Sequence, residues 1–225
     1  MTVSQGQGDL STNRLRLVGY GLLLFAVVDV VQLLYPPQLT NAVWELQTMG
    51  AIVERLPVPL LGLVMVFFGE QYDRRMWEDI FLKFLSWFCV LLALLFFLLV
   101  PLGVVNTMRI NTQNSARIEA QSQARLEELE QVERQVSQGT AQDLKTLAIE
   151  LNRLGLPVDT QKTDELKSEI LSRVTAAKEQ LPAQTEGTRK NQRRVLLKNS
   201  IKWNIGALVS SLLLFYIWRG TGWAR

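Results

Sequence analysis

The stretch from Leu82 to Val105 decides the class of this protein, and it reads Leu-Lys-Phe-Leu-Ser-Trp-Phe-Cys-Val-Leu-Leu-Ala-Leu-Leu-Phe-Phe-Leu-Leu-Val-Pro-Leu-Gly-Val-Val. From Phe84 onward it contains no charged side chain. A helix rises ~1.5 Å per residue, so roughly 20 residues cross the ~30 Å hydrocarbon core of a bilayer. Apolar side chains would cover every face of this helix, which is not typical of a helix with one face in water. The stretch therefore predicts an all-α integral membrane protein.

Three other apolar segments complete the predicted membrane region, at residues 15–34, 56–72 and 201–218. Together with residues 82–105 they predict about four transmembrane helices. The second segment is short, because its uncharged run from Leu56 to Phe68 covers only about 20 Å as a helix. It crosses the bilayer if flanking residues extend it, and otherwise it is a re-entrant segment.

The parts of the chain next to these spans are more polar. Residues 1–14 predict a flexible amino-terminal tail, without the basic start and cleavage site of a secretory signal peptide. Residues 41–55 have apolar side chains at helical spacing and polar ones between them, which predicts an amphipathic connector. A plain helical connector between spans is the alternative.

A polar segment separates the third span from the fourth. Residues 106–181 predict a soluble helical or coiled-coil insertion of three helices, at about 106–138, 140–154 and 163–181. Each of these helices has only a thin stripe of Leu, Ile and Val between charged flanks. Residues 182–200 predict a basic linker, and residues 219–225 form a short tail after the last span.

Charge asymmetry predicts the sidedness of the chain, because cytoplasmic loops carry an excess of Lys and Arg. With four spans, both termini and the short loop that contains Arg74, Arg75 and Lys83 lie on the cytoplasmic side. The polar segment at 106–200 then lies across the membrane. A basic cluster at 189–202 opposes this placement, although long translocated segments are largely exempt from the charge rule.

Polar side chains inside a span are candidate functional residues, because they are costly in hydrocarbon. Asp29 and Gln32 are the candidate intramembrane polar residues. Asp29 also fits a structural role, since it is close enough to the Pro36 end of its helix to reach the headgroups. Arg, Lys and Trp side chains at the predicted span ends form a second set of candidates, for contact with lipid headgroups. This interface set is Trp44, Arg74, Arg75, Trp77, Arg193, Arg194, Lys198, Lys202, Trp203 and Trp218.

Composition argues against several classes of function. The chain has no histidine and a single cysteine, Cys89, so the usual metal, haem and iron–sulfur ligand sets cannot be assembled. Nucleophile systems that depend on His are excluded for the same reason. We therefore expect no cofactor, no metal site and no enzymatic activity. Residues 106–200 contain fifteen Lys plus Arg and thirteen Asp plus Glu, a balance that does not indicate nucleic-acid binding.

The order of segments resembles the HpsJ-like family of cyanobacterial membrane proteins, named for the hormogonium polysaccharide gene cluster. The resemblance rests on short phrases and on the order of the spans, and covers most of residues 15–150. The phrases are Leu17-Val-Gly-Tyr-Gly-Leu-Leu-Leu, Pro36-Pro37, Trp44-Glu-Leu-Gln, Val53-Glu-Arg-Leu-Pro-Val-Pro-Leu-Leu-Gly and Val105-Asn-Thr-Met-Arg-Ile-Asn. The resemblance implies a multi-pass protein of the cyanobacterial plasma or thylakoid membrane, linked to polysaccharide secretion and gliding motility.

The expected function is that of a non-enzymatic membrane scaffold. Its partners would be the lipid bilayer and other membrane proteins, or a second copy of the chain through residues 106–181. One alternative is a subunit or assembly factor of a larger membrane complex, such as a photosynthetic one. A second alternative is a small channel or transport component that uses Asp29.

Overall fold

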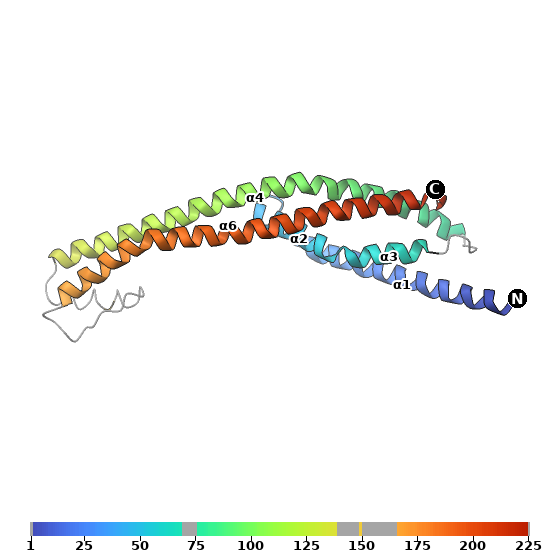
Figure 1. Ribbon diagram of the computed structural model, residues 1–225, viewed down its shortest axis with the longest axis horizontal. Helices are drawn as coiled ribbons and strands as arrows, with labels where there is room; N and C mark the ends of the chain where they lie inside the picture. Colours follow the sequence, from blue (N-terminus) through green and yellow to red (C-terminus); the bar gives the residue numbers. More distant parts are fainter. Residues whose placement is uncertain (1, 69–75, 139–148, 150–165, 225) are drawn as a thin grey trace. The chain divides into compact units, whose positions relative to one another are not determined.

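Every regular element that the structure describes is a helix. The structure, a computed structural model, describes residues 2–68, 76–138, 149 and 166–224. The α-helices are α1 (Thr2–Leu34), α2 (Ala42–Arg55), α3 (Pro57–Phe67), α4 (Met76–Gln138) and α6 (Leu166–Gly220), followed by the short 3₁₀-helix η1 (Gly222–Ala224). The predicted all-α class is confirmed (Figure 1).

The chain divides into two compact units. Unit 1 comprises Met1–Ile110 and Leu196–Arg225, and unit 2 comprises residues 111–195. Helices α4 and α6 each belong to both units, since neither has a break at the boundary. Unit 1 therefore contains the predicted spans, and unit 2 contains most of the predicted soluble insertion.

Three of the described helices are long and apolar enough to cross a membrane. They are Thr12–Leu34 in α1, a segment of α4 and a segment of α6. A fourth crossing is possible by length and composition only if α2 and α3 together make one span, bent by 41° at the break between them. Thus α3 alone, with 11 residues, is too short for the independent span predicted at 56–72.

Local chemistry explains where α2 begins and where it bends into α3. The side chain of Asn41 caps α2 by accepting hydrogen bonds from the backbone N–H groups of Val43 (3.0 Å) and Trp44 (3.4 Å). Pro57 and Pro59 lack an N–H, so they cannot donate to the carbonyls four residues earlier. Proline is tolerated in the first turn of a helix, which lets α3 start directly after the bend.

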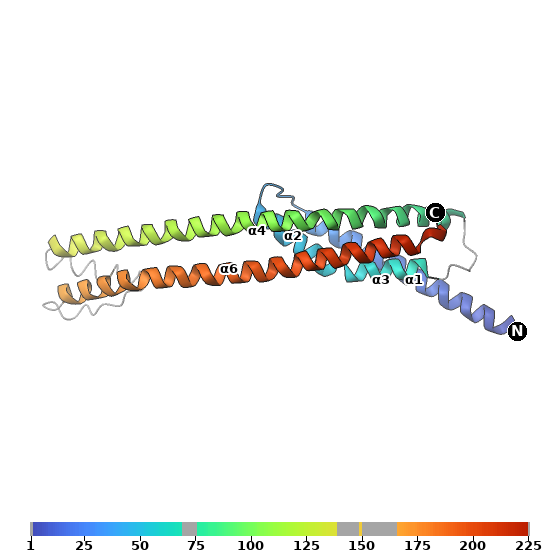
Figure 2. The same cartoon turned by 45° about the horizontal axis from the view of Figure 1, so that its top comes forward.

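Glycines allow close helix packing in unit 1. A Cβ added to Gly19 of α1 would lie 2.9 Å from the carbonyl oxygen of Gly62 in α3, and one added to Gly62 would lie 3.1 Å from the Gly19 carbonyl. The two helices lie side by side in both views (Figures 1 and 2). Close approach of this kind at small residues is typical of helices packed in membranes.

Hydroxyl groups join α4 to α6 within unit 1. Ser211 donates to the carbonyl of Ala93 (2.8 Å), and the hydroxyls of Ser86 and Thr221 lie 2.7 Å apart. These contacts run in opposite directions along the two helices, so α4 and α6 are antiparallel here. Ser86 is fully buried, whereas Leu91, Phe97 and other large apolar side chains of the same helix are exposed.

Unit 2 contains an antiparallel pair of helical segments, 111–138 of α4 and 166–195 of α6, which we call the hairpin. Its buried core is small and purely aliphatic, formed by Leu129, Val132, Val136, Ile170 and Val174. Polar pairs flank this core: Lys178 with Glu133, Arg189 with Glu119 at 3.6 Å, and Thr185 with Ser122 at 3.0 Å. The thin apolar stripes predicted from the sequence thus pack against one another within the chain.

Two predicted boundaries, those of residues 1–14 and 182–200, differ from the structure. Residues 1–14 are not a separate tail, because α1 begins at Thr2. No proline interrupts that segment, and extending an existing helix costs much less than nucleating one. The helix predicted at 41–55 corresponds to α2, which packs into unit 1 and leads directly into α3.

Residues 182–200 are not a linker but lie inside α6, which continues through Pro182. An internal proline removes one helical hydrogen bond. The helix is supported on both sides of this residue, by Ile170 and Val174 in the hairpin core and by Thr185, which donates to the Leu181 carbonyl at 2.7 Å. The helix predicted at 140–154 lies outside the described residues, apart from Ile149.

Candidate functional site

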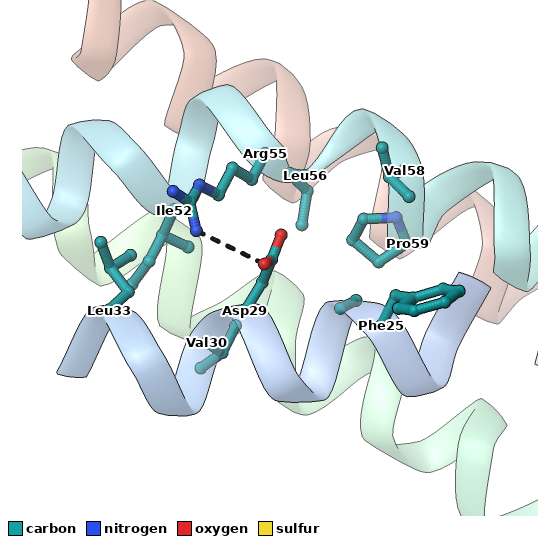
Figure 3. A pocket seen from close by; sticks show the side chains of 10 residues that line it. Phe25, Asp29, Val30, Leu33, Ile52, Arg55, Leu56, Val58 and Pro59 are labelled. Atoms are coloured by element: carbon teal, nitrogen blue, oxygen red, sulfur yellow. Dashed lines mark ion pairs between the residues drawn. The ribbon is translucent and has the colours of Figure 1, made fainter. Parts of the chain in front are cut away.

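The most distinctive polar feature in unit 1 is an ion pair at the break between α2 and α3. Arg55 is the last residue of α2, and its Nη1 lies 3.7 Å from Oδ1 of Asp29 in α1. Both side chains are about half exposed, at 51% for Arg55 and 53% for Asp29. Figure 3 shows Asp29 pointing from α1 toward Arg55. The bend at the prolines thus brings a cation to the intramembrane acid predicted from the sequence.

This ion pair borders a groove between α1 and the α2–α3 bend (Figure 3). The groove has a volume of about 60 Å³, and apart from the ion pair its lining is apolar. The lining residues are Phe25, Ala26, Asp29, Val30, Leu33, Ile52, Arg55, Leu56, Val58 and Pro59. The site therefore combines one donor group and one acceptor group with a hydrocarbon-like surface.

The ion pair lies close to one end of the apolar region. Asp29 precedes the end of α1 at Leu34 by five residues, or about 8 Å along the helix axis. A side chain at this distance from a helix end can reach the headgroup layer. The structure places Gln32 one turn later, where it is exposed.

Other polar contacts in unit 1 join α2 to α4 and α6. Glu54 accepts hydrogen bonds from Lys202 Nζ (2.6 Å) and Trp203 Nε1 (2.9 Å). Glu45 accepts from the Asn106 amide at 2.7 Å. Because Asn106 is 1% exposed, this last bond joins two helices inside the protein.

Close packing reinforces the contact of Trp203 with α2. A Cβ added to Gly50 would lie 2.2 Å from Cε2 of the indole ring, so only glycine leaves room for the ring. The neighbouring Gly206 is similarly close to Val53, where an added Cβ would lie 2.4 Å from a methyl group. The Trp203 ring is therefore half buried against α2.

The other predicted interface residues are distributed as follows. Trp77 is 84% exposed, and Arg193, Arg194 and Lys198 are exposed on α6. Trp44 is half buried, and Trp218 packs against Trp87 and Phe215, with ring centroids 6.4 and 5.5 Å away. Arg74 and Arg75 lie outside the described residues.

Sequence reasoning missed the partners of the polar residues. Arg55, Glu54 and Asn106 were not among the predicted site residues. An acid inside a span is usually paired with a cation. Arg55 could have been named for this reason, because it stands beside the proline pair that produces the bend.

Among the described residues, no group of three or more Cys, Asp or Glu side chains is placed to bind a metal ion.

The helices and their apolar surface define a helical membrane protein. The chain belongs to the HpsJ-like family, whose sequence pattern matches residues 10–222 and so covers nearly the whole chain. The match confirms the resemblance seen in the sequence. No curated protein and no solved structure matches the chain.

Proposed function

We propose that this HpsJ-like protein is a non-enzymatic scaffold that crosses the membrane four times and presents the hairpin to partner proteins on one side. The observation that carries the proposal is the continuity of α4 and α6, each of which belongs to the apolar unit 1 and to the charged unit 2. A partner bound to the hairpin would therefore be held at the membrane by two helices.

The directions of the helices in unit 1 support four crossings. Gly19 meets Gly62 and Asp29 meets Arg55, so α1 and the α2–α3 pair run antiparallel. The Tyr20 hydroxyl donates to Glu78 (3.2 Å), which places the start of α4 beside the first half of the α1 span. Since α6 is antiparallel to α4, successive segments alternate in direction. Both termini then lie on one side, and residues 106–200 lie on the other.

The surface of the hairpin suits binding to proteins better than catalysis. Its exposed faces contain both signs of charge, in pairs such as Arg189–Glu119 and Lys190–Glu186. The whole chain has no histidine, and its only cysteine is buried in unit 1. A role in polysaccharide secretion and motility, as implied by the family resemblance, is part of this proposal. The ion pair of Asp29 with Arg55 gives no support to a transport role for Asp29.

Site-specific photo-crosslinking in the full chain tests the scaffold proposal. A photoreactive residue at the exposed position Gln123 of the hairpin should give discrete protein adducts in living cells. The matched control position is Phe97, which is 57% exposed on the apolar part of α4 and should give mainly lipid adducts. Adducts with secretion or motility components would support the scaffold. Adducts with photosystem or dehydrogenase subunits would favour an assembly factor, and a hairpin that yields no protein adducts at several exposed positions would contradict both.

A further inference from the structure

The groove between α1 and the α2–α3 bend has the character of a lipid site. Apart from Asp29 and Arg55, its lining consists of alkyl and aromatic side chains. Phe25, on its rim, is 71% exposed, and Val27 and Val28 beside it on α1 are exposed as well. In a membrane-spanning unit these surfaces contact hydrocarbon chains rather than water. The occupant that matches the apolar lining is therefore an acyl chain.

The ion pair leaves hydrogen-bonding capacity unused. At 3.7 Å its nitrogen and oxygen are too far apart for a hydrogen bond, and within the described residues neither side chain makes another one. A guanidinium group has five N–H donors, and a carboxylate has acceptor positions on both oxygens. A matching headgroup must accept from Arg55 and donate to Asp29.

We propose that the groove binds one phosphatidylglycerol-type lipid. Its phosphate accepts hydrogen bonds from the Arg55 guanidinium, the geometry for which arginine is best suited. Its glycerol hydroxyls donate to Asp29, and one acyl chain lies along the apolar lining. Asp29 then disfavours a headgroup that is a bare phosphate, because the two anions would repel each other. The site depends on unit 1 being in the membrane and not on what the hairpin binds.

Native mass spectrometry of the full chain, released from detergent with added lipid, tests this site. The probes are phosphatidylglycerol, phosphatidic acid and a neutral diacylglycerol glycolipid. We expect one retained phosphatidylglycerol per chain, in preference to the other two. Arg55→Gln should weaken its retention about tenfold, because charge-assisted hydrogen bonds to the phosphate are lost. Asp29→Ala should abolish the preference for phosphatidylglycerol over phosphatidic acid.

Two further variants keep the test decisive. Lys190→Gln removes an exposed cation of the hairpin, outside unit 1, and should leave lipid retention unchanged. Ala26→Phe fills the groove without altering the ion pair, and should also displace the lipid, so the proposal stays testable if Arg55→Gln fails to fold. Equal retention by the wild type, Arg55→Gln and Ala26→Phe would overturn the proposal. An equal loss in Lys190→Gln, or equal retention of the neutral glycolipid, would overturn it as well.

Discussion

Units 1 and 2 expose opposite kinds of side chain, although α4 and α6 belong to both. Unit 1 buries a hydrophobic cluster that includes Phe96 and polar residues such as Ser86 and Asn106, and large apolar residues such as Phe97 also face outward. In the hairpin, aliphatic residues such as Ile170 are buried and charged residues cover the outside. A lipid environment for unit 1 accounts for the difference, because apolar side chains can face hydrocarbon while close packing and hydrogen bonds hold the helices together. Water supplies a hydrophobic drive for the hairpin.

The largest effect is expected from a cavity in the hairpin core. Ile170 is completely buried, so Ile170→Ala should destabilise the hairpin by about 2–5 kcal/mol. Hydrogen exchange in the full chain should show faster exchange in peptides from the hairpin and unchanged exchange in the α4 span. The control is Leu126→Ala, which alters a residue already 38% exposed and should have little effect. If both variants behaved alike, the hairpin would not depend on this core.

An added methyl group, rather than a cavity, should destabilise the packing of unit 1. Gly19→Ala places a methyl group 2.9 Å from a backbone oxygen of α3, and overpacking of this kind costs about 1–3 kcal/mol. Unfolding of the detergent-solubilised protein by increasing SDS measures the effect. Gly21→Ala, two residues away on the same helix, is the matched control, because its added Cβ meets nothing within 4 Å. Equal stability of the two variants would show that α1 does not pack closely on α3.

The smallest effect should come from an exposed ion pair of unit 2. Lys190 donates a hydrogen bond to Glu186, and this bond lowers the pKa of the Glu186 carboxyl below its usual value. A lowered folded-state pKa stabilises the fold above the ordinary glutamate pKa, and this stabilisation is lost as the pH falls through the folded value. The melting temperature of Glu186→Gln should therefore lie slightly below wild type at pH 7 and converge with it in acid. Glu179→Gln, which alters an exposed glutamate on the same helix, serves as the control. If the difference in melting temperature between wild type and Glu186→Gln widened in acid, the stabilising role of this ion pair would be contradicted.

The comparison of the units also shows what could be predicted from the sequence. Hydropathy correctly identified the all-α membrane class, because uncharged runs such as residues 84–105 have few alternatives. It did not locate the ends of the helices. A change from lipid to water alters which side chains are favoured, but it does not break the backbone, so α4 continues past Asn106. Proline residues also did not reliably mark the ends of helices. Pro57 stands at the bend between α2 and α3, whereas Pro182 lies inside α6.

The candidate site was predictable only in part. Asp29 stood out as a charge in an apolar run, but Arg55 is on another helix, and the packing of α1 against α2 and α3 aligns the two. The pairing of the thin stripes within the chain was also not predicted, because a stripe is equally compatible with self-association. Periodicity indicates which face of a helix is covered and does not identify what covers it.

The central claim is that the chain crosses the membrane four times and exposes the hairpin on the side opposite the termini. Two single-cysteine variants in a Cys89→Ala background test it directly, since Cys89 is the only native thiol. Gln123→Cys lies on the exposed surface of the hairpin, and Lys83→Cys lies at the other end of the α4 span. In intact cells, or in sealed right-side-out vesicles if the protein is in an internal membrane, a membrane-impermeant maleimide is added before and after permeabilisation. The account predicts that the cysteine at 123 is labelled at once and the cysteine at 83 only after permeabilisation. The opposite order, or labelling of both cysteines at the same stage, would contradict it.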